Sequence, residues 1–264
     1  MNEKLKKGQT LSTKLGVMVT IKEWLAEGGQ GDVYLVEYAG EEKVLKWYKK
    51  AAIGDNSQMF YDNLVDNIHR KRPDSHFIWP EDITPYNNGQ YGYIMEVLPA
   101  GYYEVGDFMN KVVMFKNYRI MIDAALNMIK AFRILHNAGL FYQDINEGNF
   151  AIDPNNGDVK IMDNDNVAPS GKSTGVLGKP RYMAPEIVIG ISNHQRAIET
   201  KADYVPPFVM PSVQSDLYSM AVILYILFTL NHPMEGKHYL VPGLTVKTQE
   251  RLYGKDVAFM MENN

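Results

Sequence analysis

Apolar and polar residues alternate over several short runs in the first third of the chain, the period-two pattern of strands that bury one face. A stretch with helical spacing interrupts these runs. The expected strands are residues 16–26, 32–38, 42–48, 78–84 and 91–97, and the expected helix is 58–69. The first third of the chain is therefore predicted to be mostly β-sheet.

The second part of the chain has a different pattern. Between residues 117 and 137 apolar residues recur every three or four positions, which predicts one long amphipathic helix. The apolar run 220–230 is too short to span a bilayer and predicts a buried helix. Residues 99–101 (Pro-Ala-Gly) are typical of a loop and mark the passage of the chain from the first lobe to the second. We expect an α+β fold with a β-rich lobe at 1–98 and a mainly helical lobe at 99–264.

Composition narrows the function classes only slightly. The 264 residues are 45% hydrophobic and 22% charged, as in ordinary globular proteins. A net charge of −4, without a basic and aromatic patch, argues against nucleic acid as a partner. The absence of cysteine excludes disulfides and thiolate metal sites and fits a reducing cytoplasm. The basic first residues lack the apolar run of a signal peptide, so we expect a cytoplasmic protein that does not insert into membranes.

Two polar stretches in the middle of the chain combine acids and amides. Asp144 stands five residues before Asn149, and Asp163 ends a strand-like run. Between them, residues 153–158 have the Pro, Asn and Gly content of a hairpin turn, which would bring Asp163 back beside the first stretch. Mg²⁺ prefers such oxygen ligands shared with substrate phosphates. The alternative is that these residues are ordinary turn residues, because Asp and Asn are common in loops.

A glycine cluster lies between the first two long expected strands. Gly28, Gly29 and Gly31 would let backbone N–H groups approach phosphate oxygens closely. A glycine cluster alone is more often just a turn. Lys46, one strand further along, is a second candidate for phosphate binding, with a solvent-exposed lysine on a strand edge as the alternative.

Together these segments resemble the eukaryotic-type (Hanks-type) Ser/Thr protein kinase family. Residues 142–149 (Tyr-Gln-Asp to Asn) match the catalytic-loop pattern H-R-D-x-x-x-x-N, and residues 163–165 (Asp-Asn-Asp) match the metal-binding D-F-G. Lys46 occupies the place of the phosphate-binding lysine, and residues 184–186 match A-P-E. Asp216 precedes the apolar run, where the family aspartate braces the catalytic loop. The ordered set implies a two-lobed protein-kinase-like fold.

The resemblance also implies ATP and Mg²⁺ as cofactors and a role for each matched residue. Asp144 would orient the acceptor hydroxyl and accept its proton, and Lys46 would clamp the phosphates. Asn149 and Asp163 would hold Mg²⁺. A nucleotide pocket between the lobes is expected, although each of its residues taken singly is explained equally well as core. The residues that would form it are Leu25, Gly28, Gly29, Gly31, Val33, Val44, Met95 as gatekeeper, Glu96, Val97, Ala151 and Met162.

Two departures from the family pattern surround the catalytic aspartate. Gln143 replaces an arginine and cannot pair with a phosphorylated loop, so activity is expected without phosphorylation of Ser170, Ser173 or Thr174. Asn146 replaces the usual lysine, and Lys179 stands where the family has a threonine. We expect Lys179 to reach Asp144 and the γ-phosphate as a further catalytic residue. The alternative is a solvated Lys179.

A third departure concerns the helix expected at 58–69. The family places a glutamate there to pair with the phosphate-binding lysine, whereas this helix offers Asp62 and Asp66. Aspartate is one methylene shorter than glutamate, so either the helix lies closer to the sheet, in which case we favour Asp62 as the partner of Lys46, or the pair is absent. Glu104 and Asp107 are both candidates for a ribose contact.

Two regions differ in length from the family pattern. The stretch 189–212 is longer than the usual link and contains Pro206, Pro207 and Pro211, which predicts a surface insertion that could shape a protein-docking surface. The residues after Gly236 are too few for the usual last helices, so the second lobe is expected to be minimal or truncated. The sequence Asp-Asn-Asp at 163–165 further resembles a bacterial branch of this kinase family, of the kind found in tellurium-resistance-like stress gene clusters.

Three function classes follow from these patterns. The first is an ATP- and Mg²⁺-dependent Ser/Thr protein kinase, whose partner is a protein substrate of open identity; the oligomeric state is open as well. The second is a small-molecule kinase of the aminoglycoside or choline phosphotransferase type, which normally lacks an A-P-E segment. The third is a weakly active, nucleotide-binding pseudokinase scaffold, favoured by Ala26 in place of a glycine, by Gln143, by Asn146 and by the missing glutamate on the helix expected at 58–69.

Overall fold

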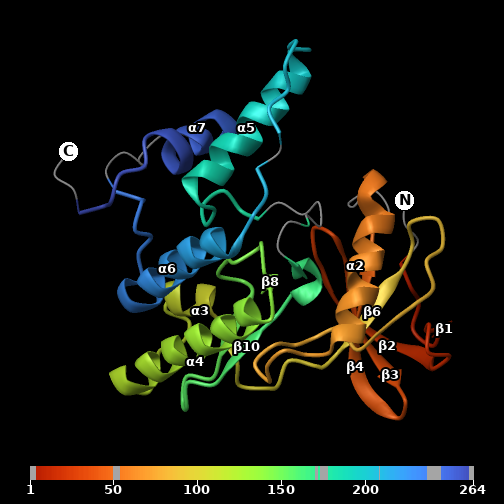
Figure 1. Cartoon of the computed structure of the whole chain (residues 1–264). Coiled ribbons are helices and arrows are strands. Elements are labelled where there is room, and N and C mark those ends of the chain that lie inside the picture. The colour runs from red at the N-terminus through yellow and green to blue at the C-terminus, as the bar shows by residue number, and fades with distance from the viewer. Residues whose placement is uncertain are drawn as a thin grey trace. The chain divides into compact units, whose positions relative to one another are not determined.

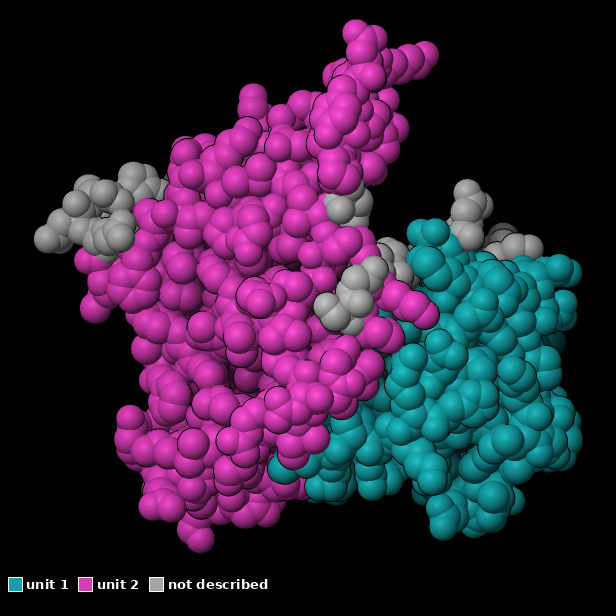
Figure 2. All heavy atoms as spheres, viewed as in Figure 1, with its two compact units in different colours: residues 1–100, 160–168 teal, residues 101–159, 169–264 magenta. Residues whose placement is uncertain are grey.

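The computed structural model describes residues 4–49, 54–169, 172, 178–207, 209–236 and 245–261 (Figure 1). The chain forms two compact units (Figure 2). Unit 1 comprises Met1–Ala100 together with Lys160–Ala168, and unit 2 comprises Gly101–Val159 together with Pro169–Asn264. The segment that carries Asp163 is therefore a part of unit 1, although it follows the catalytic-loop motif in the sequence.

Unit 1 is built on a six-stranded sheet with the order β1-β2-β3-β4-β6-β5. All neighbouring strands in it are antiparallel. The strands are β1 (Thr10–Ser12), β2 (Met18–Glu27), β3 (Gly31–Tyr38), β4 (Glu41–Tyr48), β5 (Asp82–Ile83) and β6 (Gly92–Met95). The alternating pattern of the sequence thus predicts the three long strands correctly, and only β1 has no counterpart among the expected strands.

The two faces of this sheet have different chemistry. One face carries a buried apolar cluster of Val19, Ile21, Tyr34, Val36, Leu45 and Ile94. Residues opposite each other on paired strands point to the same side, and neighbours along a strand alternate. Val33 lies opposite Lys46, and Val44 lies opposite Met95. These four residues therefore share the other face of the sheet, which leaves Lys46 on a face separate from the apolar cluster.

The strand expected at 78–84 is much shorter in the structure. Only Asp82–Ile83 forms β5, because Pro80 has no N–H to donate to a ladder. The preceding residues pair elsewhere: Ile78 N donates to Ile161 O at 2.8 Å, and Ile161 N donates to His76 O at 2.7 Å. This pairing ties the end of β10 (Val159–Ile161) to unit 1 just before Asp163.

One long helix, α2 (Ser57–Arg70), packs in unit 1 after the short turn η1 (Gly54–Asn56). It buries Phe60 and Leu64 completely, as the helical spacing predicts. Asn67 is also fully buried, and its backbone carbonyl accepts a 2.9 Å hydrogen bond from Trp79 Nε1. The helix is thereby fixed to the chain segment that leads into β5.

Unit 2 is mainly helical, as predicted. Its elements are β7 (Tyr103–Glu104), α3 (Val105–Met109), α4 (Tyr118–Asn137), β8 (Leu140–Phe141), β9 (Phe150–Ile152), α5 (Pro185–Glu199), α6 (Val213–Thr229), α7 (Val246–Glu250) and η4 (Arg251–Lys255). The Asn117 side chain accepts from Ile120 N at 3.0 Å and caps α4. Ser212 and Ser215 form a capping box at the start of α6. Within the described residues, no helix combines the length and the apolar character needed to cross a membrane.

The region expected as an insertion, 189–212, is half helical. Pro185 begins α5, which continues to Glu199, since a proline fits the first turn of a helix. The residues after α5 return along it. A Cβ atom on Gly190 would lie 2.1 Å from Val209, and His194 Nδ1 lies 2.8 Å from Pro206 O. The prolines thus lie in a segment that packs back onto its own helix.

Candidate active site

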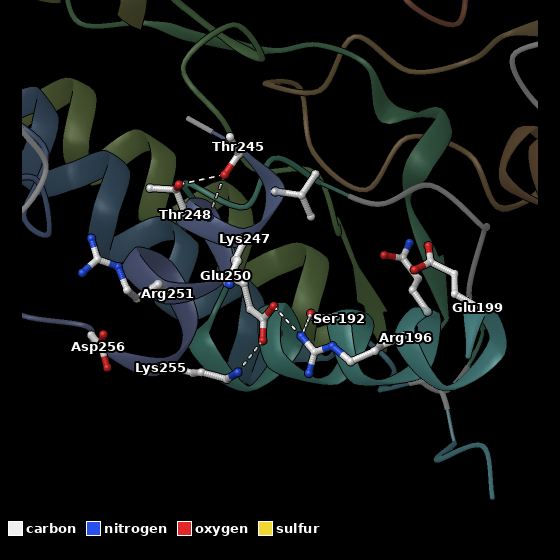
Figure 3. Close-up of a pocket in the computed structure, with 12 residues that line it drawn as sticks. Ser192, Arg196, Glu199, Thr245, Lys247, Thr248, Glu250, Arg251, Lys255 and Asp256 are labelled. Atoms are coloured by element: carbon white, nitrogen blue, oxygen red, sulfur yellow. Dashed lines mark hydrogen bonds and ion pairs between the residues drawn. The ribbon is translucent and has the colours of Figure 1, made fainter. Parts of the chain in front are cut away.

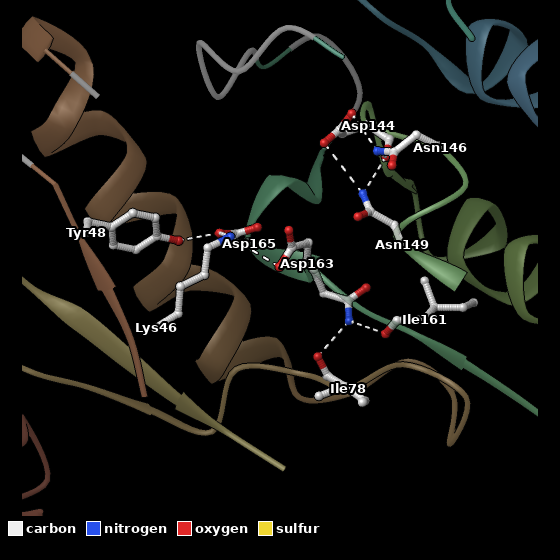
Figure 4. A network of polar contacts seen from close by, with 10 residues as sticks. Lys46, Tyr48, Ile78, Asp144, Asn146, Asn149, Ile161, Asp163 and Asp165 are labelled. Atoms are coloured by element: carbon white, nitrogen blue, oxygen red, sulfur yellow. Dashed lines mark hydrogen bonds and ion pairs between the residues drawn. The ribbon is translucent and has the colours of Figure 1, made fainter. Parts of the chain in front are cut away.

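Lys46 is the polar centre of the second face of the unit 1 sheet. It is 6% exposed, and its Nζ lies 3.2 Å from Asp163 Oδ1 and 2.7 Å from Asp165 Oδ2 (Figure 4). Burial by itself disfavours the ammonium, but the charges of Asp163 and Asp165 outweigh it and raise the pKa of Lys46 above its ordinary value. Lys46 therefore keeps its charge at every physiological pH.

The segment of Asp163 is held by amide side chains rather than by an apolar residue. Asn164 stands where the family pattern has a phenylalanine and is buried. Its Nδ2 donates to Ile78 O at 2.6 Å and to Ile161 O at 2.7 Å. From α2, Asn63 and Asn67 each donate to Val167 O at 2.8 Å. The turn η2 (Asn164–Asn166) is thus fixed from two sides within unit 1.

Asp163 itself has a left-handed backbone with φ of 50°. Aspartate tolerates this conformation better than most residues. Its side chain remains 42% exposed, and one of its oxygens is used by Lys46. The other carboxylate oxygen is therefore a candidate metal ligand.

The expected pairing of Lys46 with Asp62 is wrong. Asp62 accepts from Gln58 Nε2 at 2.9 Å, and Asp66 pairs with Arg70 at 3.7 Å. Asp62 comes directly before Asn63, and Asp66 directly before Asn67; the two asparagines face η2. Consecutive helical residues are rotated by about 100° around the axis, so both acids point away from the lysine.

The glycine turn between β2 and β3 is closed by a 2.8 Å hydrogen bond from Gly28 N to Gly31 O. A Cβ atom on Gly31 would lie 2.5 Å from Trp47 O on β4. Gly31 is therefore required by the close approach of β3 and β4, whether or not it contacts phosphate. Gly29 has open space around it, so the packing gives no comparable reason for that glycine.

The other residues expected around a nucleotide lie as follows. In unit 1, Val33, Val44 and Met95 share the face of Lys46. Leu25 is 44% exposed and lies where the ladder of β2 and β3 is irregular, between Trp24 and Ala26. Three expected residues lie beyond β6 or just before Asp163. Glu96 pairs with Arg72 at 3.0 Å, Val97 is 39% exposed, and Met162, which precedes the segment 163–165 (the metal segment), is half-buried.

Ala151 belongs to unit 2 and is fully buried in β9, opposite Glu104 on β7. The proposed ribose residues have local roles there. Glu104 and Asp107 form a capping box at the start of α3, in which Glu104 N donates to Asp107 Oδ2 at 3.1 Å. A cap explains both acids without a ligand.

Asp216 at the start of α6 holds the catalytic loop from within unit 2, as the resemblance implies. It is 2% exposed, and its Oδ2 accepts from Tyr142 N at 2.7 Å and lies 3.0 Å from His136 Nε2. Its Oδ1 accepts from Gln143 N at 3.1 Å. Gln143 has a φ of 73°, a sparsely populated conformation for such a residue. Asp216 therefore stabilises the strained turn that leads directly into Asp144.

Asp144 is surrounded by two amides (Figure 4). Asn146 Nδ2 donates to Asp144 O at 3.0 Å and to its Oδ1 at 3.1 Å. Asn149 Nδ2 donates to Asp144 O at 2.8 Å. Because this hydrogen bond uses the Asn149 amino group, the carbonyl oxygen Oδ1 is the end available to a cation.

Lys179 binds side chains near Asp144 in the sequence, and its expected contact with Asp144 itself remains a prediction. Its Nζ donates to Asn146 Oδ1 at 3.0 Å and lies 3.5 Å from Glu147 Oε1. Asn146 connects the lysine to the aspartate because it donates to Asp144 with its amino group. The amide thus relays the position of Lys179 to Asp144, and the two departures from the family pattern do lie together.

Arg181, just before the Ala-Pro-Glu motif at 184–186, belongs to a network that the sequence pattern did not predict. Arg181 binds Glu235 with Nε at 2.5 Å and with Nη2 at 2.9 Å, and Tyr253 OH donates to Glu235 at 2.8 Å. His232 Nε2 lies 2.8 Å from Arg181 O. Gly178 packs closely too, since a Cβ atom there would lie 2.9 Å from Gln143 O. The sequence His-Pro-Met-Glu at 232–235 contains the histidine and the glutamate that contact Arg181, and it was the only local hint of this network.

The described part of the chain has no group of three or more His, Cys, Asp or Glu residues suited to a metal ion. Asp163 in unit 1 and Asn149 in unit 2 each carry an oxygen of the kind that Mg²⁺ prefers, and this ion usually takes only one or two protein ligands together with phosphate oxygens and water. Ser170, Ser173 and Thr174 lie outside the described residues.

A pocket of about 1090 Å³ in unit 2 contains none of the expected nucleotide-binding residues (Figure 3). It lies along α5 and α7. Of its charged residues, Glu250 pairs with Arg196 and with Lys255, both at 2.7 Å. The charge of Glu250 is therefore balanced by two cations.

Comparison with known proteins gives one family. The sequence model described as "Protein kinase domain" matches residues 19–249. Protein kinase C delta type from Mus musculus is 25% identical over 226 residues, which cover 82% of this chain and 30% of that protein. The probable serine/threonine-protein kinase PknB from Bifidobacterium longum is 24% identical over 233 residues, which cover 86% and 28%. This chain thus spans less than a third of the length of these relatives.

A further relative and a solved structure agree. The serine/threonine-protein kinase PknA from Mycobacterium tuberculosis is 30% identical over 140 residues, which cover 50% of this chain and 28% of that protein. The crystal structure of a double mutant of the Mycobacterium tuberculosis PknI kinase domain has a TM-score of 0.58 at 19% identity and covers 88% of this chain and 80% of its own. At this identity the structure establishes the α+β kinase fold alone.

Proposed function

Because this chain belongs to the protein kinase domain family, we propose that it is a Ser/Thr protein kinase, which moves the γ-phosphate of ATP to hydroxyl groups of protein substrates. Relatives named as serine/threonine-protein kinases support this choice. The observation that carries it is the buried Lys46 ammonium, 3.2 Å from the Asp163 carboxylate. A fixed cation beside an oxygen ligand is the arrangement that positions phosphates for transfer.

Lys46 acts in this proposal as the clamp for the α- and β-phosphates. Its charge is secure because the neighbouring acids hold its pKa above the ordinary value. Asp163 and Asn149 would each offer Mg²⁺ one oxygen, and when bound the ion neutralises the β- and γ-phosphates. The apolar residues Val33, Val44 and Met95, on the same face as Lys46, suit an adenine ring.

Asp144 orients the acceptor hydroxyl and takes its proton. Asn146 supports this role because it donates to Asp144 Oδ1 at 3.1 Å and so fixes the orientation of the carboxylate. Lys179, through Asn146, places a positive charge near the catalytic loop. We propose that it replaces the cation that the family carries at the position of Asn146.

The test is transfer of radiolabelled phosphate from γ-labelled ATP, first to the protein itself and then to a panel of proteins. Mass spectrometry of the product identifies the acceptor side chain. Asp144→Asn and Asp163→Asn are the loss variants, and the exposed Asp203→Asn is the matched control. Label on serine or threonine in the wild type and control alone supports the proposal. Transfer to small-molecule alcohols alone, or equal label in all variants, refutes it.

The narrower resemblance concerns the Asp163-Asn164-Asp165 segment. We propose that the chain belongs to a bacterial branch that shares this wording and is encoded near tellurium-resistance-like stress genes. The hydrogen bonds of Asn164 to Ile78 and Ile161 give a structural reason for an asparagine at the middle position of this motif. The identity of neighbouring genes in the source genome checks this proposal.

A further inference from the structure

The third residue of the metal segment, Asp165, has no exposed surface. Its Oδ2 lies 2.7 Å from Lys46 Nζ, closer than the 3.2 Å between Lys46 and Asp163. Tyr48, which is also fully buried, donates its hydroxyl to the same oxygen (Figure 4). The family pattern has a glycine at this position, so the carboxylate is an addition that the fold must accommodate.

The surroundings make this carboxylate dependent on Lys46. Asp165 Oδ1 is buried and has no hydrogen-bond partner among the described residues. The charge of Asp165 is therefore balanced through Oδ2, by the lysine and the tyrosine. A buried ion that loses its partner is strongly unfavourable, which couples the two side chains tightly.

The sheet and α2 together fix the geometry of this pair. Lys46 and Tyr48 are two positions apart on β4, so both side chains leave the same face. On the other side, Asn63 Nδ2 donates to Val167 O at 2.8 Å and lies 3.5 Å from Asp165 O. The backbone that carries Asp165 is thereby attached to α2, while the acids of α2 are directed elsewhere.

We propose that Asp165 is the positioning residue of Lys46: it holds the ammonium where the nucleotide phosphates are bound, in place of an acid on α2. This inference rests on the proposed nucleotide-binding function. One short segment, 163–165, then supplies both a metal ligand and the support of the phosphate-binding lysine. The clamp is consequently assembled inside unit 1 and needs no carboxylate from α2.

The experiment compares the affinity of the purified protein for ADP and for adenosine by isothermal titration calorimetry. EDTA is present, so a direct role of Asp165 in binding metal does not contribute. Asp165→Asn keeps the shape but removes the charge, and Tyr48→Phe removes one hydrogen bond. We expect Asp165→Asn to weaken ADP binding about tenfold or more, the size of one charge-assisted hydrogen bond. Adenosine affinity should change by less than about twofold, because it has no phosphate for Lys46 to bind.

Three controls separate positioning from a merely structural role. Asp62→Asn should leave the ADP affinity unchanged. Tyr48→Phe should give a smaller loss than Asp165→Asn, also confined to ADP. In a Lys46→Met background, Asp165→Asn should cause no further loss, because it acts through the lysine. A melting curve of each variant confirms that it is folded.

Several outcomes would overturn the inference. They are an unchanged ADP affinity in Asp165→Asn, an equal loss for ADP and adenosine, a loss that persists without Lys46, and a loss produced by Asp62→Asn. A wild-type protein that binds ADP no better than adenosine refutes nucleotide phosphate binding itself. If ADP binding and its dependence on Asp165 hold but no phosphate is transferred to protein, the positioning role stands and the protein kinase function fails.

Discussion

Asp216→Asn is the most informative single change in unit 2. The wild-type carboxylate accepts backbone N–H groups from Tyr142 and Gln143, at 2.7 and 3.1 Å, and its Oδ2 lies 3.0 Å from His136 Nε2. An asparagine has one oxygen and one amino group at this place. In either orientation, at least one buried N–H group then faces another donor.

The magnitude follows from these bonds. Hydrogen bonds to a charged group contribute about 1.5–3 kcal/mol each, and one donor is left without a partner in the variant. The other contacts keep an acceptor but lose its charge. We therefore expect the free energy of unfolding to fall by about 2–4 kcal/mol. The strained Gln143, with its φ of 73°, loses support at the same time, so kcat should fall as Asp144 loses its orientation.

The assay is urea denaturation followed by circular dichroism, together with steady-state kinetics on folded protein. Asp203→Asn, an exposed aspartate of the same unit, is the control and should change stability by less than about 0.5 kcal/mol. A change in Asp216→Asn as small as in this control would contradict the reasoning. So would a kcat equal to that of the wild type.

Three further predictions concern unit 2. Lys179→Ala should lower kcat about tenfold with little change in KM for ATP, because the lysine acts through Asn146; an unchanged kcat would leave Lys179 as a solvated residue. Arg181→Met should lower the free energy of unfolding by about 2–3 kcal/mol, since the partly buried Glu235 loses a bidentate partner. The double variant with Glu235→Leu should recover most of this loss in urea denaturation, and no recovery would argue against a paired role. Burial lowers the pKa of His232 below its ordinary 6.5, so the unfolded chain takes up a proton first as the pH falls. Stability from this group is therefore full above pH 6.5 and is lost below it, and His232→Asn should flatten the decrease in melting temperature between about pH 6.5 and pH 5.

Local pattern predicts the elements of this protein well. The alternation along β2, β3 and β4 and the helical spacing of α4 each depend on neighbours a few residues away, so a short window contains the information. Prediction fails where a distant segment competes for the backbone. The strand expected at 78–84 is shortened because Ile78 bonds to Ile161, which is 83 positions further along the chain by the difference of the two numbers.

The candidate site shows the same division. Residue type and spacing single out Asp144, Asn149 and Asp163, because phosphoryl transfer needs acids and amides in fixed local order. Residue type and spacing did not predict the partner of Lys46. The family pattern predicts an acid on α2, but the rotation of that helix turns Asp62 away from the lysine and presents Asn63 to the metal segment.

Residue pattern alone was enough for the fold class and for the order of the motifs, and it singled out the residues that we propose for the phosphate chemistry. Tertiary structure alone decided which charges meet. Lys46 and Asp165 are 119 residues apart and become partners because one is on a strand face and the other in a turn anchored to α2. Lys179 likewise contacts Asn146, which is 33 residues earlier in the chain. Such pairings depend on strand register and helix rotation, which are set by packing of the whole unit and leave no local pattern in the chain.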